Sequence, residues 1–422
     1  MNPDIVVIGA GALGLSTALH CALKGRTVVV VERDAPGSQA SGRAAGLFKS
    51  VQADELRTAL ARRSITRAVS FSDWARVPLE VARSGSFLVA RTDEHQAHLR
   101  VEAGRSRGWG ADVTEAGPGE LSRRVSYYHG DGRELALWCP EDVYIEEPTH
   151  LVRALAAACR RHGVELLESE AVTEISLRGG QVTGLRTARR SMTATTVVDA
   201  AGAWTRQVAE LARESHAAPS HAAPSRAAPG RAAGPAVAVA PVRHQLLITE
   251  PAAGLKGVQP IVRVVDAAVY LRPARGGLML GGFEADPLPV DPRSQPATFR
   301  TDDLPLDLGV LRKMGALVAA QVPLAGELAV AEHRGGMFTM TPDGRFIAGP
   351  VPDVPGLWVA SGCNGSGFSS SLAIGEALAG WITDMPGRLD ISALSPARFG
   401  PLTDEALITD GVWQYAHYYD PA

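Results

Sequence analysis

The sequence predicts an α/β protein, α+β overall, in which a Rossmann-type domain is combined with a second domain built on a mixed or antiparallel sheet. Three observations lead to this prediction. Residues 5–32 run in the order strand, glycine turn, helix, strand and acid. A second glycine-rich loop, at 362–367, precedes a helical stretch near the other end of the chain. Between these two stretches, β-like and helical segments alternate.

The N-terminal stretch has the order that a dinucleotide-binding βαβ unit requires. An apolar run at 5–8 is followed by glycines and then by a helical pattern of apolar residues at 15–23. A second apolar run, 27–31, ends at Glu32. A glycine-rich turn of some other α/β protein is the alternative, but strand, helix and acid all favour nucleotide binding.

Each glycine of this turn has a predicted role. Gly9 permits a tight turn, Gly11 lets the backbone approach a pyrophosphate, and Gly14 lets the helix pack closely on the strand. The helix N-terminus presents N–H groups and partial positive charge to the phosphates. Glu32 can accept hydrogen bonds from both ribose hydroxyls.

Composition restricts the class of protein. The chain has 422 residues, enough for two or three compact units, and its net charge of −3 provides no basic surface for nucleic acid. The four cysteines have neither metal-ligand nor CxxC spacing, so we expect no metal site and no disulfide framework. They are Cys21, Cys139, Cys159 and Cys363. Free thiols indicate a reducing compartment.

The apolar stretch at 5–23 raises the alternatives of a membrane span and a signal peptide. Asp4 stands where a signal peptide carries positive charge, and three glycines and His20 interrupt the run. Glu32 fits the nucleotide-binding interpretation instead. We therefore expect a cytoplasmic protein without a membrane partner.

Hydrophobic periodicity predicts the elements between the two glycine-rich loops. The predicted helices are 55–82, 94–107, 148–162, 304–322 and one that begins near Ser371. The predicted strands are 86–91, 164–167, 172–177, 182–187, 195–204, 242–250, 267–282 and 357–360. Polar loops are expected after residue 107, as far as Trp138 and Tyr144.

Two segments stand outside this pattern. Residues 215–236 are rich in alanine and proline with a period of five, so we expect a disordered insertion with no catalytic part. Residues 387–422 form a C-terminal tail that ends in WQYAHYYDPA. We expect this aromatic end to be a strap packed on the surface, with a partner contact as the alternative.

Two glycine-rich loops that each precede a helix favour a cofactor larger than one nucleotide turn can hold. FAD fits better than NAD, because its flavin ring must reach a second domain. A nicotinamide dehydrogenase is the weaker enzymatic alternative.

Seven stretches together resemble the FAD-dependent amine and amino-acid oxidoreductases of the D-amino acid oxidase superfamily, in particular its sarcosine oxidase and dimethylglycine dehydrogenase branch. They are IVVIGAGALGLSTA (5–18), ASGRAAGLF (40–48), VVDAAGAW (197–204), VRHQLLITEP (242–251), YLRPARGGLMLGGFE (270–284), MFTMTPDGRFIAGP (337–350) and GLWVASGCNGSGFSSSLAIGEALA (356–379). The resemblance implies a discontinuous FAD-binding domain and a substrate domain. We place the first at 1–84, 146–214 and 333–386, and the second at 85–145 and 237–332.

We expect FAD to be bound by residues of these stretches and their neighbours. They are Gly9, Ala10, Gly11, Ala12, Leu13, Gly14, Glu32, Arg33, Ser41, Gly42, Arg43, Ala45, Gly46, Leu47, Val172, Ala201, Gly202, Trp204, Gly336, Gly362, Asn364, Gly365, Gly367, Phe368 and Ser369. Family members with a covalent flavin use a His or a Cys where this chain has Arg43 and Gly336. The FAD is therefore expected to be non-covalent. Arg43 beside the flavin could stabilise the reduced ring or simply pin its loop.

The substrate site departs from the family's pattern. Phe338 stands where glycine and D-amino-acid oxidases have a carboxylate-binding Arg, and Ser369 replaces a Lys of sarcosine oxidases. Lys49 could stand for the Arg of that branch; the alternative is an ordinary exposed lysine. The candidate substrate contacts are Lys49, His244, Tyr270 and Arg272. For the last two a solvated sheet face is the alternative, and for His244 a structural role.

The resemblance implies oxidation of a C–N bond of an amine or N-substituted amino acid by hydride transfer to the flavin, which gives an imine. Oxygen or another protein would then reoxidise the flavin. The alternative is a non-enzymatic flavoprotein that keeps the fold. No folate-binding domain follows in the sequence, so the chain is expected to act alone or with a separate partner subunit.

Overall fold

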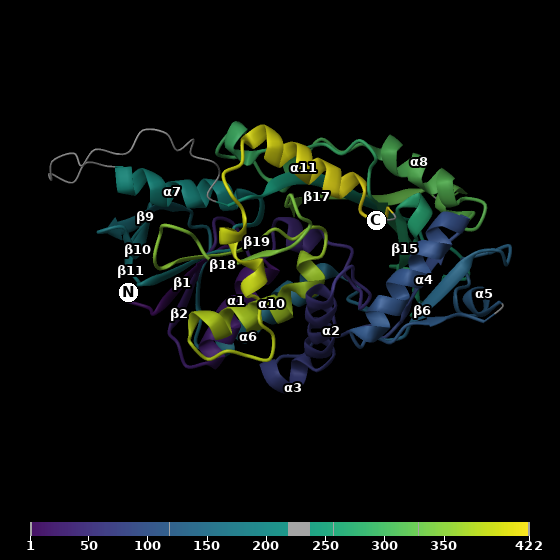
Figure 1. The fold of residues 1–422 in the computed structure, drawn as a ribbon, viewed down its shortest axis with the longest axis horizontal. Helices are drawn as coiled ribbons and strands as arrows, with labels where there is room; N and C mark the ends of the chain where they lie inside the picture. Colours follow the sequence, from purple (N-terminus) through teal and green to yellow (C-terminus); the bar gives the residue numbers. More distant parts are fainter. Residues whose placement is uncertain (1, 118, 218–236, 256, 328, 421–422) are drawn as a thin grey trace.

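The computed structural model describes residues 2–117, 119–217, 237–255, 257–327 and 329–420. Most of the predicted insertion lies outside these residues. The helices and strands form two large sheets with helices packed against them (Figure 1). The mixed α/β class predicted from the sequence is confirmed.

The first large sheet has six strands in the order β18-β19-β12-β1-β2-β8. These are β18 (Ile347–Pro350), β19 (Leu357–Ser361), β12 (Thr196–Asp199), β1 (Ile5–Ile8), β2 (Val28–Val31) and β8 (Glu165–Leu167). All neighbours are parallel except β18 and β19. The central strands are unbroken runs of Val and Ile and are buried throughout, as expected for a parallel sheet covered on both faces.

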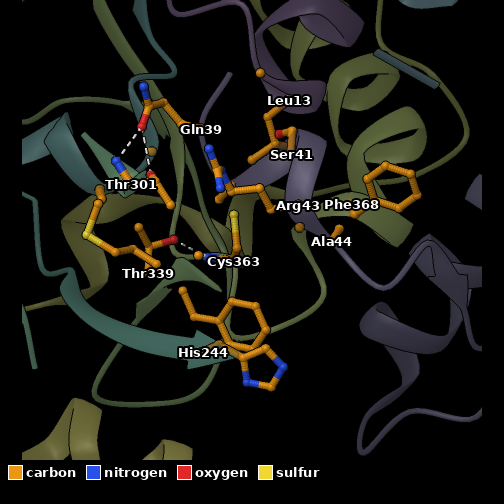
Figure 2. Close-up of a pocket in the computed structure, with 18 of the residues that line it drawn as sticks. Leu13, Gln39, Ser41, Arg43, Ala44, His244, Thr301, Thr339, Cys363 and Phe368 are labelled. Atoms are coloured by element: carbon orange, nitrogen blue, oxygen red, sulfur yellow. Dashed lines mark hydrogen bonds between the residues drawn. The ribbon is translucent and has the colours of Figure 1, made fainter. Parts of the chain in front are cut away.

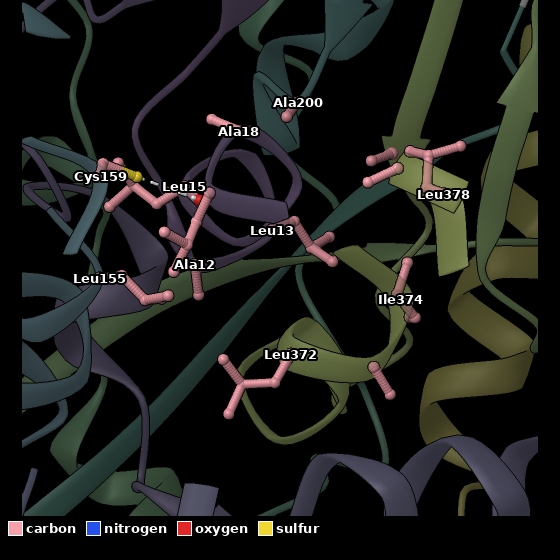
Figure 3. Packing of buried hydrophobic residues seen from close by; sticks show 14 of the residues in the cluster. Ala12, Leu13, Leu15, Ala18, Leu155, Cys159, Ala200, Leu372, Ile374 and Leu378 are labelled. Atoms are coloured by element: carbon pink, nitrogen blue, oxygen red, sulfur yellow. Dashed lines mark hydrogen bonds between the residues drawn. The ribbon is translucent and has the colours of Figure 1, made fainter. Parts of the chain in front are cut away.

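Helices α1 (Ala12–Leu23), α6 (Pro148–Arg161) and α10 (Gly367–Ile382) pack together in the largest core cluster. Figure 3 shows Leu15 of α1 between residues of the other two helices. The approach of α1 to α10 depends on Gly375, because a Cβ there would lie 2.3 Å from Ser16 Oγ. Helix α2 (Glu55–Val69) packs on α10 from outside and is followed by α3 (Phe71–Ala75).

A three-stranded sheet of β9 (Val172–Arg178), β10 (Gln181–Thr187) and β11 (Ser191–Thr193) packs with α7 (Thr205–Ala217) near the six-stranded sheet. Strands β9 and β10 are antiparallel and joined at Gly179 and Gly180, as predicted.

The second large sheet has eight strands in the order β17-β13-β16-β15-β14-β4-β6-β5. They are β17 (Val330–Met340), β13 (Ala240–Thr249), β16 (Gly277–Gly282), β15 (Val269–Ala274), β14 (Ile261–Val264), β4 (Ser86–Ala90), β6 (Leu135–Cys139) and β5 (Thr114–Glu115). All neighbours are antiparallel except β14 and β4. Helices α4 (Asp93–Gly108), α5 (Glu120–Arg124), α8 (Leu308–Val318) and α9 (Leu324–Glu327) accompany this sheet. A short pair, β3 (Leu47–Phe48) and β7 (Val143–Tyr144), lies apart from both large sheets.

Four predictions about elements were wrong. The region expected as polar loops before Tyr144 contains β5, α5 and β6, and β6 is buried because its LALWC run pairs with β4. Strand β17 begins at Val330 and belongs to the eight-stranded sheet, so the expected boundary at residue 333 falls inside a strand. The helix expected over 55–82 stops at α3, and Arg76 after it has a left-handed φ of 59°. The helix expected over 304–322 begins only at Leu308, where the Asp307 side chain caps it.

The C-terminal tail reaches further into the molecule than the sequence indicated. It contains α11 (Asp404–Ala416), which packs on β13 and β17 (Figure 1). Tyr415 is fully buried, and Tyr418 and Tyr419 line an internal cavity. The segment therefore packs on the sheet with Trp413, His417 and Asp420 exposed, as expected of a strap, and its tyrosines also form part of the cavity wall.

Candidate functional site

One cavity of about 590 Å³ lies between the two large sheets and receives residues from both. At one end it is lined by Gly9, Gly11 and Glu32 of the βαβ unit. At the other end it is lined by side chains of the eight-stranded sheet, such as His244 and Tyr270.

The first glycine loop adopts the geometry that its sequence predicts. Gly9 has a φ of +101°, and a Cβ there would lie 2.6 Å from the Ala200 carbonyl oxygen. A Cβ on Gly14 would lie 2.0 Å from the Gly9 oxygen, so only glycine allows α1 to begin this close to β1. The Ala12 N–H donates to Ser41 Oγ at 3.0 Å, which ties the loop to the 40–43 turn.

Glu32 lies at the end of β2, and its two oxygens hold the surrounding backbone. Oε2 accepts from the Ala10 N–H at 2.7 Å, and Oε1 accepts from the Asp34 N–H at 2.8 Å. Burial raises the pKa of Glu32, although these hydrogen bonds oppose the shift. Each oxygen keeps a further lone pair for a donor in the cavity.

An aromatic and a basic side chain meet at the Glu32 end of the cavity. The Arg33 guanidinium lies 4.5 Å from the centroid of the Trp204 ring, and both side chains line the cavity. Val172, Ala201 and Gly202 line it nearby. These residues offer a planar surface and backbone edges around Glu32.

The second glycine loop divides into lining and supporting residues. Asn364 does not line the cavity; its side chain bonds Thr341 and the Gly362 carbonyl and so fixes the loop's shape. Gly362 supports in the same way, because a Cβ there would lie 2.7 Å from the Thr341 methyl group. Asn364 and Gly362 thus shape the second loop from behind the cavity wall, and their part in FAD binding stays a prediction. Gly365, Gly367, Phe368 and Ser369 do line the cavity.

The residues expected at the covalent attachment positions carry no nucleophile. Arg43 lines the cavity and bonds Asp302 at 2.6 Å, which supports a loop-pinning role. Gly336 lines the cavity on β17. Figure 2 shows Arg43 beside Cys363, with Gln39 hydrogen-bonded to Thr301 and His244 across the pocket. Burial raises the pKa of the Cys363 thiol to about 11, so it is protonated near neutral pH.

His244 is the centre of a hydrogen-bonded trio. Its Nδ1 lies 2.7 Å from Tyr415 Oη and its Nε2 lies 2.9 Å from Tyr270 Oη. Its ring stacks on Phe338 with centroids 4.0 Å apart. Burial lowers the pKa of His244 to about 3, so the ring is neutral near neutral pH.

Gly281 allows this trio to form. Strand β16 lies between β13, which carries His244, and β15, which carries Tyr270. Tyr270 pairs with Gly281 in register, and a Cβ on Gly281 would lie 2.2 Å from Tyr270 Oη. The tyrosine therefore crosses the strand only because the residue between is glycine.

Lys49 lines the same end of the cavity, and its ammonium donates to Tyr418 Oη. Arg263 lines it as well: its Nη2 bonds Ser86 Oγ and Asp142 Oδ2, each at 2.6 Å. Sequence reasoning missed Arg263 and Tyr418. The only available signals were an Arg in a β-like run and the aromatic tail, and neither indicates which side chain points into the cavity.

Arg272, expected as a substrate contact, lies behind the cavity wall. It is fully buried, does not line the cavity and donates to the Ala45 and Glu146 carbonyls, with Glu146 Oε2 at 2.9 Å. Its guanidinium also lies 4.5 Å from the Tyr144 ring centroid. The alternation that places it on the face of Tyr270 is real, but a packed loop covers it.

The other expected cofactor residues fall into two groups. Those that line the cavity directly are Gly9, Gly11, Leu13, Glu32, Arg33, Ser41, Arg43, Ala45, Gly46, Leu47, Val172, Ala201, Gly202, Trp204 and Gly336. Those that shape its wall from behind are Ala10, Ala12, Gly14 and Gly42. Within the described ranges, no cluster of side chains could hold a metal ion and no helix could cross a membrane.

Comparison with known proteins agrees with this geometry. The family described as FAD dependent oxidoreductase (DAO) matches residues 4–381. A 4-methylaminobutanoate oxidase (formaldehyde-forming) of Paenarthrobacter nicotinovorans is 26% identical over 93% of this chain and 45% of its own length. Mouse mitochondrial sarcosine dehydrogenase is 25% identical over 94% of this chain and 41% of its own length.

A regulatory protein and a solved structure are also similar to this chain. The mouse pyruvate dehydrogenase phosphatase regulatory subunit is 23% identical over 94% of this chain and 43% of its own length. The chain thus spans less than half the length of these curated relatives. The crystal structure of L-proline dehydrogenase from P. horikoshii superposes with a TM-score of 0.80 at 22% identity, covering 94% of this chain and 98% of that one.

The cavity fits the cofactor that the family name states. A Cβ at Gly9 or Gly14 would collide with backbone atoms near the N-terminus of α1, so the glycines keep the chain compact there. Glu32, which lines the same end of the cavity, can still accept further hydrogen bonds. The cavity then continues to the eight-stranded sheet, as a cofactor with a distant ring system requires. From the family match and this cavity together, the chain belongs to the FAD-dependent oxidoreductase (DAO) family, and its cofactor is FAD.

Proposed function

We propose that this chain oxidises the C–N bond of an amine or N-substituted amino acid by hydride transfer to FAD, which gives an imine. The observation that carries the proposal is the single cavity that joins the Glu32 end to the chamber of His244, Tyr270 and Lys49. The relatives support it, since 4-methylaminobutanoate is by its name a secondary amine with a carboxylate.

We assign the FAD adenosine half to the end of the cavity at Glu32. The carboxylate would accept from ribose hydroxyls, and the first-turn N–H groups of α1 would face the pyrophosphate. Arg33 and Trp204 would flank this half, and Gly336 and Gly365 the other. Small residues at these positions leave room for a ring system against the backbone.

FAD, when bound, supplies an acceptor for the hydride that leaves the carbon next to nitrogen. The protein's task is to position an amine that has lost its proton. Neutral His244 shares its two ring nitrogens between Tyr415 and Tyr270, so one tyrosine donates to the ring and the other accepts from it. In either arrangement the Tyr270 hydroxyl keeps a lone pair or a proton for the substrate nitrogen.

The charges at the end of the cavity near His244 and Lys49 favour a substrate that has a negatively charged group. Lys49 and Arg263 line this end, and the acids that line the cavity, Glu32, Glu170 and Glu210, belong to the βαβ unit, the 170–172 stretch and α7. Asp142 already balances Arg263. Lys49 has no carboxylate partner among the residues that the structure describes, so it provides the uncompensated charge. A carboxylate on the substrate would balance the Lys49 charge.

An anaerobic titration tests the proposal. The purified holoprotein is mixed without oxygen with a panel of secondary amines and N-methyl amino acids, and the visible flavin band is followed. Bleaching by at least one compound is expected, and admission of air or of an artificial electron acceptor then distinguishes an oxidase from a dehydrogenase. No bleaching by any amine, with FAD retained, would contradict the proposal.

That negative outcome would favour a second candidate, a non-enzymatic flavoprotein. The regulatory subunit among the relatives supports it. A separate protein partner would then be expected to bind with an affinity that depends on FAD.

A further inference from the structure

The segment after α11 reaches the substrate end of the cavity, although the family match ends at residue 381. Helix α11 crosses β13 and β17, and Gly411 allows close contact because a Cβ there would lie 2.7 Å from Ala240 Cβ. At its first turn, Asp404 pairs with Arg206 and with Arg293. The start of the helix is therefore clamped to the body of the protein.

The end of α11 is held just as firmly. Tyr415 Oη lies 2.7 Å from His244 Nδ1, and Gln414 donates to the Pro342 carbonyl at 3.1 Å. Beyond the helix, the Tyr418 ring stacks on Phe283 with centroids 3.9 Å apart and an interplanar angle of 7°. Tyr419 meets Phe283 edge-on. Tyr419 also meets the Tyr418 ring edge-on, so Tyr418 is positioned by contacts with both Phe283 and Tyr419.

Tyr418 faces Lys49. The Lys49 ammonium donates to Tyr418 Oη and lies 4.4 Å from the centroid of its ring. Ser366 Oγ lies 3.4 Å from the same hydroxyl, at the outer limit of a hydrogen bond. Within the described ranges, Lys49 has no carboxylate partner.

The pair offers donors to the cavity. An ammonium has three N–H groups and no acceptor, and one of these N–H groups is used on Tyr418. Because the tyrosine oxygen accepts that bond, its own O–H is left to donate elsewhere. Two N–H groups and one O–H therefore remain on this pair, and among the described residues no acid of this end lines the cavity. Such a donor set matches the two oxygens of a carboxylate.

We propose that Tyr418 is a specificity residue that binds the substrate carboxylate through its hydroxyl, together with Lys49. The C-terminal segment then supplies half of an anion subsite, and the substrate class is narrowed to amines that carry a carboxylate. This inference rests on the proposed amine oxidation for the identity of the substrate, but the subsite is tested without turnover.

The test uses butanoate and butanamide as probes, which differ in charge but hardly in shape. Each is titrated against the holoprotein at pH 7, and binding is read from the shift of the visible flavin band. Butanoate is expected to bind at least about tenfold more tightly than butanamide. Y418F should reduce that preference about tenfold, as for loss of one hydrogen bond to a charged group, and K49M should abolish it.

The phenylalanine variant keeps the ring that stacks on Phe283, so FAD content and thermal midpoint should stay at wild-type values. W413F is the matched control: it changes an aromatic residue of α11, shortly before Tyr418 in the chain, whose side chain is largely exposed. The preference of this variant for butanoate should equal that of the wild type. An unchanged butanoate preference in Y418F would overturn the inference. Absence of any preference in the wild type would overturn it too, while leaving oxidation of neutral amines intact.

A pH series separates a binding role from a packing role. Burial raises the pKa of Tyr418, but the Lys49 charge, the hydrogen bonds of Lys49 and Ser366 and the Arg57 charge together outweigh burial, so the pKa lies below the ordinary value for tyrosine. Ionisation removes the O–H donor and cancels the Lys49 charge. Butanoate affinity of the wild type should therefore fall as the pH rises through this pKa, and Y418F should lack that step; the same step in Y418F would contradict the assignment.

Discussion

At the end of the cavity assigned to the substrate, a single residue determines whether two side chains can form a hydrogen bond. The Tyr270 hydroxyl meets His244 across a whole strand, and only the missing side chain of Gly281 leaves that path open. At the other end, both oxygens of Glu32 already hold backbone N–H groups. A substitution at Gly281 or Glu32 that adds or replaces only one or two atoms should therefore alter the site around it.

G281A should move the Tyr270 ring away from His244, because the new methyl group would occupy the position of its hydroxyl. With an amine that the wild type oxidises, kcat/KM should fall at least about tenfold while FAD content stays unchanged. G104A is the control, since a Cβ there meets no atom within 4 Å. Wild-type kcat/KM in G281A would show that the trio has no part in the reaction.

E32Q should weaken FAD binding about tenfold or more, as charge-assisted hydrogen bonds to the ribose become neutral ones. Because burial raises the pKa of Glu32, wild-type affinity should also decline as the pH falls through that raised pKa. The variant should lack this decline. Isothermal titration of the apoprotein with FAD measures both effects, and E165Q on β8 serves as an exposed control. Equal dissociation constants for wild type and E32Q would place the ribose elsewhere.

Pairs of elements are joined by ion pairs as well as by apolar packing. Glu376 of α10 accepts from Arg63 of α2 through two bonds of 2.7 Å, and Arg67 of α2 bonds the same carboxylate. Burial alone would raise the pKa of Glu376, but the two arginines lower it to about 2. The α2–α10 contact thus combines these ion pairs with the apolar packing of the largest core cluster.

E376Q should lower the free energy of unfolding at pH 7 by about 1–3 kcal/mol, less than for a fully buried pair because the group is partly exposed. The wild-type carboxylate contributes stability above its unfolded pKa of 4.5 and loses it as the pH falls through about 2. Urea unfolding at pH 7 and pH 3 should therefore show a smaller difference at the lower pH. E168Q, in an exposed pair with Arg160, should change little at either pH. A difference between E376Q and wild type that does not shrink at pH 3 would assign it to packing instead of charge.

At the scale of the whole molecule, one cavity connects the two large sheets. Its walls come from the βαβ unit, the second glycine loop, the eight-stranded sheet and the C-terminal segment. A cofactor bound along it contacts all of these parts at once, so binding should stabilise the molecule as a unit.

The FAD should be released by acid precipitation, because Arg43 and Gly336 provide neither imidazole nor thiol and the Cys363 thiol is protonated. Absorbance of the supernatant and of the washed pellet measures the partition. Flavin retained on the wild-type pellet would contradict non-covalent binding, and its release in C363A would identify the attachment.

The sequence by itself determined the βαβ unit, the second glycine loop and the family. These features depend on local spacing, since Gly9, Gly14 and Glu32 act within one short unit whose geometry follows from neighbours in the chain. Only the tertiary structure decided that Arg272 is packed behind a loop while Arg263, on the adjoining strand, lines the cavity. It also decided that Tyr418 faces Lys49, because that contact joins two ends of the chain that are related by packing alone. Strand alternation gives a side chain a face, but the element that covers that face is set by contacts far away in sequence.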